Sequence, residues 1–370
     1  MSTLDSVAPG QAARVPTTWL RRAYAFLVSP RLALALLVAV LACCVLGVTV
    51  WREARAWELI FSTLWFNGLL TLLAVSSGAA FFTRIWKRKL TLVSGGMILF
   101  HLSFLALLVG VVLNGLLGFK GVLRLTEGET LSNGRIESYD LVEHGPFFDF
   151  DRLRGETTLH RMHARYIVDG AEKRAAYEVE IGQGEGKTAG TIYVTQDLEH
   201  DGVRYLRSKE GYSILLVLMD GQGNELYGAH VPLQSVKQPH GGYAYVTGSP
   251  KGPEGMLFPP PPEEARAELI VSYQPDAKVE RAGSVGFRVL PLDPGGAPGP
   301  ERKGEAAVGG VFDAGSFKLV PREIRYWVGM DVRYDPGLPI ILASLCFGLG
   351  GMFITLVGRV RQGAARRPAA

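Results

Sequence analysis

Cysteine is scarce in this chain of 370 residues, and its placement excludes several kinds of chemistry. The three cysteines are Cys43 and Cys44, in an early apolar run, and Cys346, in a late one. The long region between these runs has none, so a disulfide-stapled domain, a zinc knuckle and a C-x-x-C dithiol are excluded there. We interpret all three as small apolar packing residues, with a redox or metal role left open for the adjacent pair.

The short motifs of common enzymes are also missing. The central region has no G-x-S-x-G, H-E-x-x-H, Walker or G-x-G-x-x-G pattern in a suitable context, which gives no support for a hydrolase, a kinase or a dehydrogenase. Its basic residues, such as Arg204, Arg207 and Lys209, are interleaved with acidic ones. That mixture is typical of a solvated surface, so we expect no nucleic-acid partner and no catalytic residue.

The chain instead contains four long apolar runs, at roughly Leu32–Val50, Leu59–Phe82, Leu92–Leu117 and Leu338–Val357. A helix needs about 20 residues to cross the hydrocarbon core of a bilayer. The first run begins too late and is too long for a cleaved signal peptide, so we interpret it as a retained anchor. The sequence predicts an integral membrane protein with four transmembrane α-helices, three N-terminal and one C-terminal.

Positive charge flanks these runs unevenly. Basic residues precede the first run, fill the loop between the second and third, and follow the fourth: Arg14, Arg21, Arg22 and Arg31; Arg84, Lys87, Arg88 and Lys89; Arg359, Arg361, Arg366 and Arg367. The positive-inside rule then places both termini in the cytoplasm. We expect a cytoplasmic arm at 1–29, three helices within 30–119, an extracytoplasmic domain at 120–334, a fourth helix at 335–358 and a basic cytoplasmic tail at 359–370.

The region 120–334 has the pattern of a β protein. Short alternating or β-branched runs recur between turn signals: Gly121–Leu125, Ala164–Val168, Ala176–Ile181, Gly190–Gln196, Tyr212–Leu218, Glu225–Val231, Gly242–Val246, Ala267–Tyr273, Gly286–Leu290, Phe317–Val320 and Ile324–Asp331. The pairs Asp169-Gly170 and Asp220-Gly221 are favoured in tight hairpin turns. Because long helical stretches are missing, we expect an exported all-β domain of the sandwich or barrel type.

Two proline- and glycine-rich segments, Pro250–Glu264 and Pro291–Gly304, interrupt this pattern. We expect them to be surface loops that divide the domain into a larger first part and a smaller second part.

The segment before the last apolar run has two further signals. We interpret Tyr326, Trp327 and Tyr334 as an interfacial aromatic belt. Asp335 is placed as a helix N-cap, with Pro336 at the first helical position.

His101 is the most informative single residue, because it lies about ten residues, or roughly 15 Å of helix, into the third run. A polar ring is costly at that depth and is therefore a functional candidate, and neutral imidazole is a common ligand of haem iron. Its helix face is apolar and suits a porphyrin edge better than a proton relay. That face holds Ser94, Met97, Phe104, Leu105 and Leu108.

A buried histidine that is hydrogen-bonded to a neighbouring helix remains the alternative for His101. Since the other three runs contain no histidine, a six-coordinate haem would need its second axial ligand from another polypeptide. Small residues in the same run permit close packing against such a partner: Gly95, Gly96, Ser103, Ala106 and Gly110.

The other histidines give weaker signals. His160 and His163 form an H-x-x-H pair, which would share one face of a helix but point to opposite faces of a strand. No nearby Cys or Glu in the sequence completes a metal-binding set. We expect surface or loop roles for the scattered His144, His200, His230 and His240.

Several membrane-proximal segments point to a family. They are Ser29–Ala33 before the first run, Gly118–Gly121 and Leu125–Glu129 after the third, and Tyr334–Gly337 before the last. With these segments, a β domain between the third and fourth spans, and His101 in the third, the chain resembles the ResB family of cytochrome c biogenesis proteins, which belong to the Ccs or System II pathway. The chain is short for that family, and its proline-rich segments are its own.

This resemblance implies a location in the bacterial inner (cytoplasmic) membrane and three partners: a tryptophan-rich membrane protein of the ResC or CcsA type, apocytochrome c, and a thioredoxin-like thiol reductant. It implies that the complex moves haem b outward, as a transient ligand or substrate, and attaches it to CxxCH thiols. His101 is then a haem axial ligand. The partner's tryptophan-rich motif is absent from this chain, so we expect a non-catalytic subunit of a cytochrome c synthase (haem lyase) complex.

Two other functions compete with this hypothesis. One is a cofactor-free, membrane-anchored scaffold that recruits envelope proteins through its exported β domain. The other is a sensor, which the absence of a cytoplasmic output domain in the sequence makes the weaker alternative.

Overall fold

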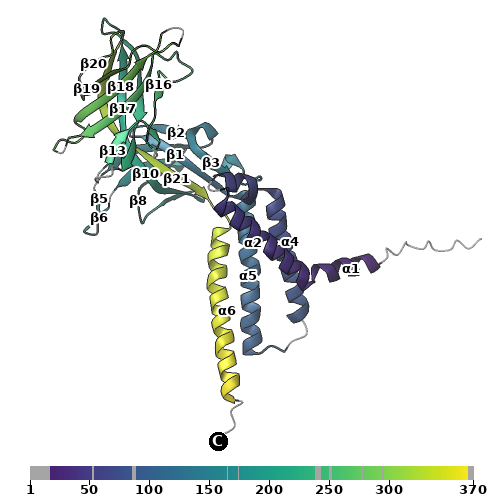
Figure 1. Ribbon diagram of the computed structural model, residues 1–370. Helices are drawn as coiled ribbons and strands as arrows, with labels where there is room; N and C mark the ends of the chain where they lie inside the picture. Colours follow the sequence, from purple (N-terminus) through teal and green to yellow (C-terminus); the bar gives the residue numbers. More distant parts are fainter. Residues whose placement is uncertain are drawn as a thin grey trace, which may run out of the picture. The chain divides into compact units, whose positions relative to one another are not determined.

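The computed structural model describes residues 17–51, 54–85, 89–164, 166–173, 175–237, 243–249, 252–276, 278–293 and 296–365. They form two compact units (Figure 1). The helical unit comprises Met1–Phe119, Glu143–Phe148 and Asp335–Ala370, and the β unit comprises Lys120–Val142 and Asp149–Tyr334. Several residues named above lie outside the described ones: Arg14, Lys87, Arg88, His240, Pro250, Arg366 and Arg367.

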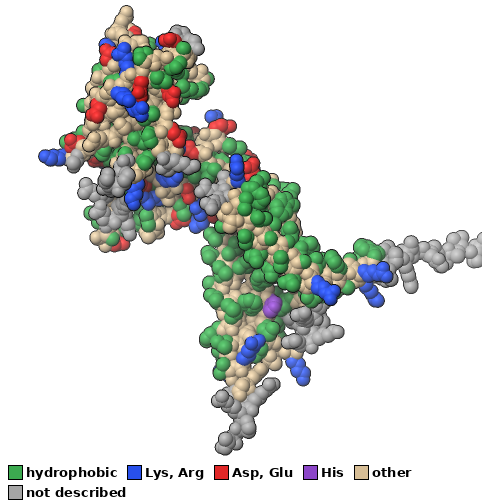
Figure 2. All heavy atoms as spheres, in the orientation of Figure 1, with side chains coloured by type: hydrophobic (Ala, Val, Ile, Leu, Met, Phe, Trp, Pro, Cys, Tyr) green, Lys and Arg blue, Asp and Glu red, His purple; other side chains and the backbone are tan. Residues whose placement is uncertain are grey.

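Within the described residues, four helices are long and apolar enough to cross a membrane: Pro30–Thr49, Leu64–Phe82, Leu92–Leu117 and Leu338–Gly363. They lie in helices α2 (Pro30–Thr49), α4 (Leu64–Ile85), α5 (Leu92–Leu117) and α6 (Leu338–Ala365). Figure 2 shows that hydrophobic side chains cover much of the visible surface of this unit. The predicted membrane protein with four transmembrane helices is confirmed.

The second span begins later than the hydropathy indicates. Its expected first residues, from Leu59, belong to a π-helical turn, η1 (Trp57–Phe61), which follows a short α3 (Ala54–Ala56), and the continuous helix starts only at Leu64. The Asn67 side-chain amide donates hydrogen bonds to the carbonyl oxygens of Phe61 (3.0 Å) and Thr63 (2.9 Å). The Asn67 side chain thus ties the π-helical turn to the start of α4, where the Thr63 carbonyl oxygen also accepts the Asn67 backbone N–H (3.1 Å).

Both ends of the helical unit contain more helix than the sequence suggested. Thr17–Leu27 of the expected arm form helix α1, on which Trp19, Tyr24 and Phe26 are exposed. The Ser76 hydroxyl donates to the carbonyl oxygen of Leu27 (2.6 Å), which ties the end of α1 to α4. At the other end, α6 continues to Ala365, past the expected boundary at residue 358.

Helices α5 and α6 pack closely because small residues face each other between them. A methyl group added at Gly96 would lie 2.7 Å from the carbonyl oxygen of Gly351, and one added at Gly110 would lie 3.0 Å from that of Gly337. The Ser103 hydroxyl similarly faces Gly348. These small residues therefore serve packing within the chain, so assigning Gly96, Ser103 and Gly110 to a partner helix was wrong.

The return from the β unit into α6 also differs from expectation. Helix α6 begins at Leu338, so Pro336 lies in a turn before the helix and not at its first position. The Leu338 N–H donates to the carbonyl oxygen of Asp335 (3.1 Å), and the Gly337 N–H donates to the side-chain oxygen of Asn114 on α5 (2.6 Å). A side chain of α5 thus satisfies a backbone donor at the start of α6.

The β unit is built from antiparallel strands in three main sheets, as expected for an all-β domain. The seven-stranded sheet has the order β11-β10-β21-β1-β3, with β9 beside β10 and β20 beside β21. The six-stranded sheet has the order β12-β13-β17-β18-β19, with β16 beside β17, and the four-stranded sheet has the order β2-β4-β7-β8. Two small ribbons, β5-β6 and β14-β15, complete the described strands.

The strands of the seven-stranded sheet are β1 (Phe119–Thr126), β3 (Tyr139–His144), β9 (Leu198–His200), β10 (Val203–Met219), β11 (Glu225–Pro232), β20 (Phe312–Asp313) and β21 (Lys318–Tyr334). Those of the six-stranded sheet are β12 (Gln234–Lys237), β13 (Tyr243–Val246), β16 (Met256–Phe258), β17 (Ala267–Pro275), β18 (Gly283–Pro291) and β19 (Arg302–Ala307). The remaining strands are β2 (Thr130–Ser132), β4 (Glu156–His163), β5 (Tyr166–Val168), β6 (Ala171–Lys173), β7 (Ala176–Gly182), β8 (Thr188–Tyr193), β14 (Gly248–Ser249) and β15 (Gly252–Pro253).

Two long strands organise the β unit. β10 and β21 have 17 residues each and pair from Arg204 with Arg333 to Met219 with Lys318. Alternate residues of β10, such as Ile214 and Leu216, are fully buried in one core with Leu269 of β17 and Val285 of β18. Two sheets thus enclose a shared core, which is the sandwich arrangement that the alternating pattern indicates.

The predicted interfacial aromatic belt is wrong for two of its three residues. Tyr326 and Trp327 belong to β21 and are 6% and 3% exposed. The Trp327 indole N–H donates to the carbonyl oxygen of Leu233 (2.8 Å) inside the β unit. Since their rings are buried among strands, these two residues are core residues and not membrane-interface anchors.

The proline-rich segments do not divide the β unit. Pro250–Glu264 contains strand β16, which pairs with β17, and Pro291–Gly304 runs into β19, which pairs with β18. Because the strands on both sides of each segment belong to one sheet, the expected separation into a larger and a smaller part was wrong.

The two Asp-Gly pairs have different outcomes. Asp169 and Gly170 both have positive φ (50° and 76°), so they form the expected tight turn between β5 and β6. At Asp220 the loop is longer, because the Asp220 N–H donates to the carbonyl oxygen of Asn224 (2.9 Å) and Gly223 takes the positive φ. The Asp220 carboxylate accepts the backbone N–H groups of Gln222 and Asn224 and holds this longer loop.

Candidate functional site

The imidazole of His101 lies on an exposed face of helix α5. Its ring stacks on Phe81 of α4, with centroids 4.6 Å apart and planes within 7°, and meets the edge of Phe100 at 5.6 Å. Two aromatic rings therefore fix the plane of the imidazole. Because the span itself is apolar, this face is directed to lipid or to another membrane protein.

One ring nitrogen of His101 already has a partner. Nδ1 lies 2.7 Å from the carbonyl oxygen of Met97, one helical turn earlier, and a carbonyl oxygen can only accept a hydrogen bond. A neutral ring then carries its proton on Nδ1, which leaves the lone pair on Nε2. Metal-binding histidines are usually oriented in this way, with the other nitrogen donating to a carbonyl oxygen or a carboxylate.

The alternative role for His101 does not fit this geometry. A histidine buried against a neighbouring helix would donate to that helix, whereas His101 is exposed, bonds to its own helix and stacks on the ring of Phe81 of α4. Within the described residues, no group of three or more His, Cys, Asp or Glu side chains could hold a metal ion. In the part of the chain that the structure describes, the site therefore offers one imidazole nitrogen, Nε2, beside the stacked ring of Phe81.

A comparison with protein families supplies the context for this histidine. The family model of the ResB-like family matches residues 88–368, which include α5, the β unit and α6. The chain belongs to the ResB-like family. A comparison with curated proteins finds no match. Family membership implies a function related to cytochrome c biogenesis, and His101 lies within the matched part of this ResB-like chain.

The H-x-x-H pair lies on strand β4, where a bulge changes its geometry. The pairing of β4 with β7 shifts register between Leu159 and Arg161, at His160 itself. His160 Nε2 then lies 3.8 Å from Glu180, and His163 Nε2 lies 2.8 Å from Glu178. Because Glu178 and Glu180 are two residues apart on β7, both histidines are on one side of the sheet, and the expectation of opposite faces was wrong.

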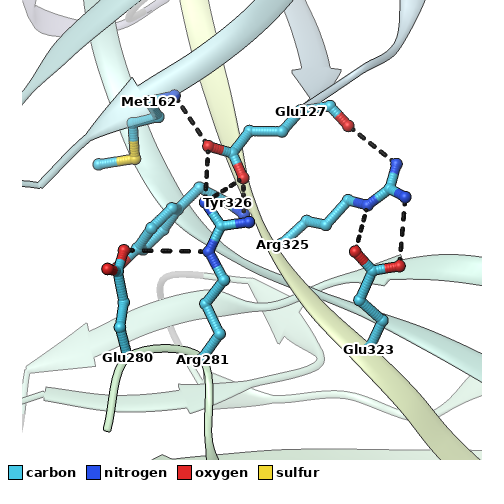
Figure 3. A network of polar contacts seen from close by, with 7 residues as sticks. All are labelled: Glu127, Met162, Glu280, Arg281, Glu323, Arg325 and Tyr326. Carbon is cyan, nitrogen blue, oxygen red and sulfur yellow. Dashed lines mark hydrogen bonds and ion pairs between the residues drawn. The ribbon is translucent and has the colours of Figure 1, made fainter.

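The structure shows a polar network in the β unit whose role the sequence did not reveal (Figure 3). Glu127, which is 6% exposed, accepts the backbone N–H groups of Met162 (2.9 Å) and Tyr326 (3.2 Å). Its carboxylate also pairs with Arg281 (2.9 Å), while its carbonyl oxygen accepts from Arg325 (3.1 Å). Glu127 thus connects β4 and β21 to the turn between β17 and β18. The family-like segment Leu125–Glu129 contained it, but nothing in the sequence indicates its burial.

Of the scattered histidines that the structure describes, His144 is exposed as expected, whereas His200 and His230 are partly buried strand residues. His144 ends β3, His200 ends β9 beside the Thr188 hydroxyl (2.9 Å), and His230 lies in β11. Among the described residues, His230 Nδ1 is buried without a hydrogen-bond partner.

Acid should weaken the fold partly through His230. Burial is the main cause that lowers its pKa, and Arg325 adds to the effect, against Glu323 and Glu129. A lowered folded-state pKa means that the unfolded chain binds the proton more readily, so stability is lost as pH falls below about 6.5. We expect thermal unfolding of the solubilised chain to lose less stability on acidification from about pH 7.5 to about pH 5.5 in His230→Gln than in the wild type. Equal losses would contradict this role.

The three cysteines lie in the helical unit and are all free thiols. Cys43 and Cys44 are partly buried and pack against a core that includes Leu36, Ile60 and Leu70, whereas Cys346 is exposed on α6.

Proposed function

We propose that this ResB-like chain is a subunit of the System II cytochrome c maturation complex. In this proposal the complex moves haem b across the bacterial inner membrane and assists its covalent attachment to the CxxCH thiols of apocytochrome c. Haem is the substrate that is moved, and His101 provides one of its axial ligands.

The geometry of His101 is the observation that carries the proposal. The hydrogen bond from Nδ1 to the Met97 carbonyl oxygen (2.7 Å) sets the tautomer and makes Nε2 a better electron-pair donor. The stacked Phe81 holds the ring in one orientation. An imidazole prepared in this way, on an apolar exposed face, supports haem ligation better than it supports a structural role.

The remaining parts of the reaction are assigned to partners. The helices α2, α4 and α6 contain no histidine, so the second axial ligand is assigned to the tryptophan-rich ResC or CcsA-type protein. All three cysteines lie in α2 and α6, and the β unit has none to reduce the CxxCH thiols. A thioredoxin-like protein is therefore the proposed reductant, and the β unit is the proposed docking surface for apocytochrome c.

Charge supports the proposed orientation. Arg359 and Arg361 near the end of α6, and Lys89 just before α5, lie at the two span ends that must share one side of the membrane. The positive-inside rule assigns that side to the cytoplasm. The β unit, which connects the opposite ends of α5 and α6, is then extracytoplasmic.

The test is an absorption spectrum of the complex, co-purified with its tryptophan-rich partner. We expect His101→Gly to remove most of the haem Soret band and added imidazole to restore it, because free imidazole can occupy the vacated axial position. His160→Gly, which changes an exposed histidine of the β unit, is the matched control and should keep the band. An unchanged band in His101→Gly would contradict the proposal and favour a cofactor-free scaffold.

A further inference from the structure

Helix α1 (Thr17–Leu27), which the proposed role of His101 does not use, has one apolar side and one basic side. At about 100° per residue, its large apolar residues share one side of the helix. They are Trp19, Leu20, Ala23, Phe26 and Leu27. Arg21 and Arg22 lie on the other side, and the sequence of this helix contains no acidic residue. Such a helix is suited to a boundary between an apolar and a polar medium.

The apolar side of α1 is not covered by the rest of the described chain. The side chains of Trp19, Leu20 and Phe26 are 56%, 50% and 64% exposed, and Tyr24, at the edge of this side, is 49% exposed. Contiguous apolar surface of this kind marks a contact with a membrane or with another molecule. Tryptophan and tyrosine are enriched where a protein meets the interface between membrane and water. The aromatic residues of α1 therefore favour a lipid surface as the medium that covers this side.

The arginines beside this apolar side have no acidic partner. The side chains of Arg21 and Arg22 are exposed and form no ion pair with any residue that the structure describes. The same holds for Arg31 in the first turn of α2. Figure 2 shows basic side chains beside hydrophobic ones on α1. Unpaired cations next to exposed apolar residues are complementary to an anionic phospholipid leaflet, which is apolar inside and negatively charged at its surface.

The end of α1 is attached at the depth of the membrane boundary. Two residues separate it from α2, whose span begins at Pro30. The carbonyl oxygen of Leu27 accepts a hydrogen bond from the Ser76 hydroxyl of α4 (2.6 Å). Ser76 lies six residues, or about 9 Å of helix, before the end of the α4 span at Phe82. Interfacial helices bury their apolar side about 5–10 Å into the boundary between headgroups and acyl chains, which matches this depth.

The length and direction of α1 also suit a helix on the membrane surface. Eleven residues give about 16 Å of helix, which is too short to cross a hydrocarbon core of about 30 Å. In Figure 1, α1 extends away from α2 and α4 and does not run alongside them. The helix is therefore neither a further span nor a packed member of the bundle.

We propose that α1 lies in the plane of the membrane surface and binds anionic phospholipids. Its apolar side, with Trp19 and Phe26, enters the boundary between headgroups and acyl chains, and Arg21 and Arg22 contact the lipid phosphate groups. Bound in this way, α1 anchors the start of the first span and the Ser76 position of α4. The interaction involves no haem and goes beyond the proposed function. Only the assignment of α1 to the cytoplasmic surface rests on the orientation proposed above.

The test measures how close Trp19 lies to lipids whose acyl chains carry bromine, which quenches tryptophan fluorescence. The full-length chain is placed in nanodiscs of equal parts phosphatidylcholine and phosphatidylglycerol, with bromine on only one of the two lipids. The difference between each protein and its Trp19→Phe version isolates the Trp19 signal. We expect both lipids to quench Trp19, with about a fivefold local excess of phosphatidylglycerol. One basic residue near an anionic surface contributes about 1 kcal/mol, which corresponds to about this factor.

Three double variants test the role of the arginines. Arg21→Gln/Arg22→Gln should remove the preference for phosphatidylglycerol, whereas Arg21→Lys/Arg22→Lys should keep most of it because lysine retains the charge. The matched control is Arg359→Gln/Arg361→Gln, which removes two exposed charges near the end of α6 and should behave like the wild type.

Three results would overturn the proposal. If neither brominated lipid quenched Trp19, α1 would not lie in the membrane, and a protein partner would cover its apolar side. Equal quenching by both lipids in the wild type would mean that α1 inserts without recognising anionic headgroups. A preference that persisted in Arg21→Gln/Arg22→Gln would assign lipid binding to other residues. None of these results bears on the Soret band of His101→Gly, so the two proposals can fail separately.

Discussion

Gly96→Ala should destabilise the helical unit, whereas Gly95→Ala at the adjacent position should not. A methyl group at Gly96 would lie 2.7 Å from both the carbonyl oxygen of Gly351 and the backbone nitrogen of Thr355 on α6, and backbone atoms cannot turn aside as a side chain can. Helices in lipid gain much of their association energy from such close contact between small residues. We expect a loss of about 1–3 kcal/mol, which is the usual cost of overpacking a core.

Gly95 provides the matched control because it lies in the same turn of α5. A methyl group there meets no atom within 4 Å. Alanine favours a helix over glycine by up to about 1 kcal/mol, so Gly95→Ala should be neutral or slightly stabilising. The pair Gly350 and Gly351 repeats the comparison on α6, since only Gly351 approaches α5.

Thermal unfolding of each variant in one detergent measures both predictions. Both substitutions add one methyl group. Gly96→Ala should lower the midpoint temperature of unfolding, whereas Gly95→Ala should raise it slightly or leave it unchanged. Equal shifts for Gly95→Ala and Gly96→Ala would mean that the helices do not approach along this line of small residues.

The membrane architecture could be predicted from the sequence because hydropathy and charge are local signals. The α5 run matched its helix from Leu92 to Leu117, and His101 was visible as a polar residue in an apolar run. The sequence could not show which of the small residues on α5 contact another helix. Gly95 and Gly96 look alike in sequence, and only the position of α6 makes one of them a contact and the other an open surface.

Prediction from the sequence is limited in the same way for the β unit. The long strands such as β10, β17 and β18 were visible from alternating residues, whereas β3, β4 and β19 were not expected. Tyr326 and Trp327 looked like interface aromatics because they precede an apolar run. Their burial depends on the pairing of β21 with β10, far away in the sequence. The bulge at His160 and the burial of Glu127 likewise arise from pairing between distant segments.

Glu127→Gln should cost much more stability than Glu280→Gln, although both glutamates contact Arg281. The Glu127 carboxylate is buried and accepts two backbone N–H groups as well as the guanidinium. An amide has only one oxygen to accept bonds, and its NH₂ group would face a backbone donor or Arg281. Breaking a buried pair costs about 3–5 kcal/mol, and because the Arg281 side chain is 33% exposed we expect about 2–3 kcal/mol.

Glu280 is the control because its side chain is 64% exposed and lies 3.9 Å from Nε of Arg281. Ion pairs at such exposed positions contribute about 0–1 kcal/mol, so Glu280→Gln should change the free energy of unfolding by no more than that. Denaturant unfolding of the full-length chain, followed by fluorescence of Trp327 and the other tryptophans, would measure the difference. If both variants unfolded at the same denaturant concentration, Glu127 would not be the link between β4, β21 and the β17–β18 turn.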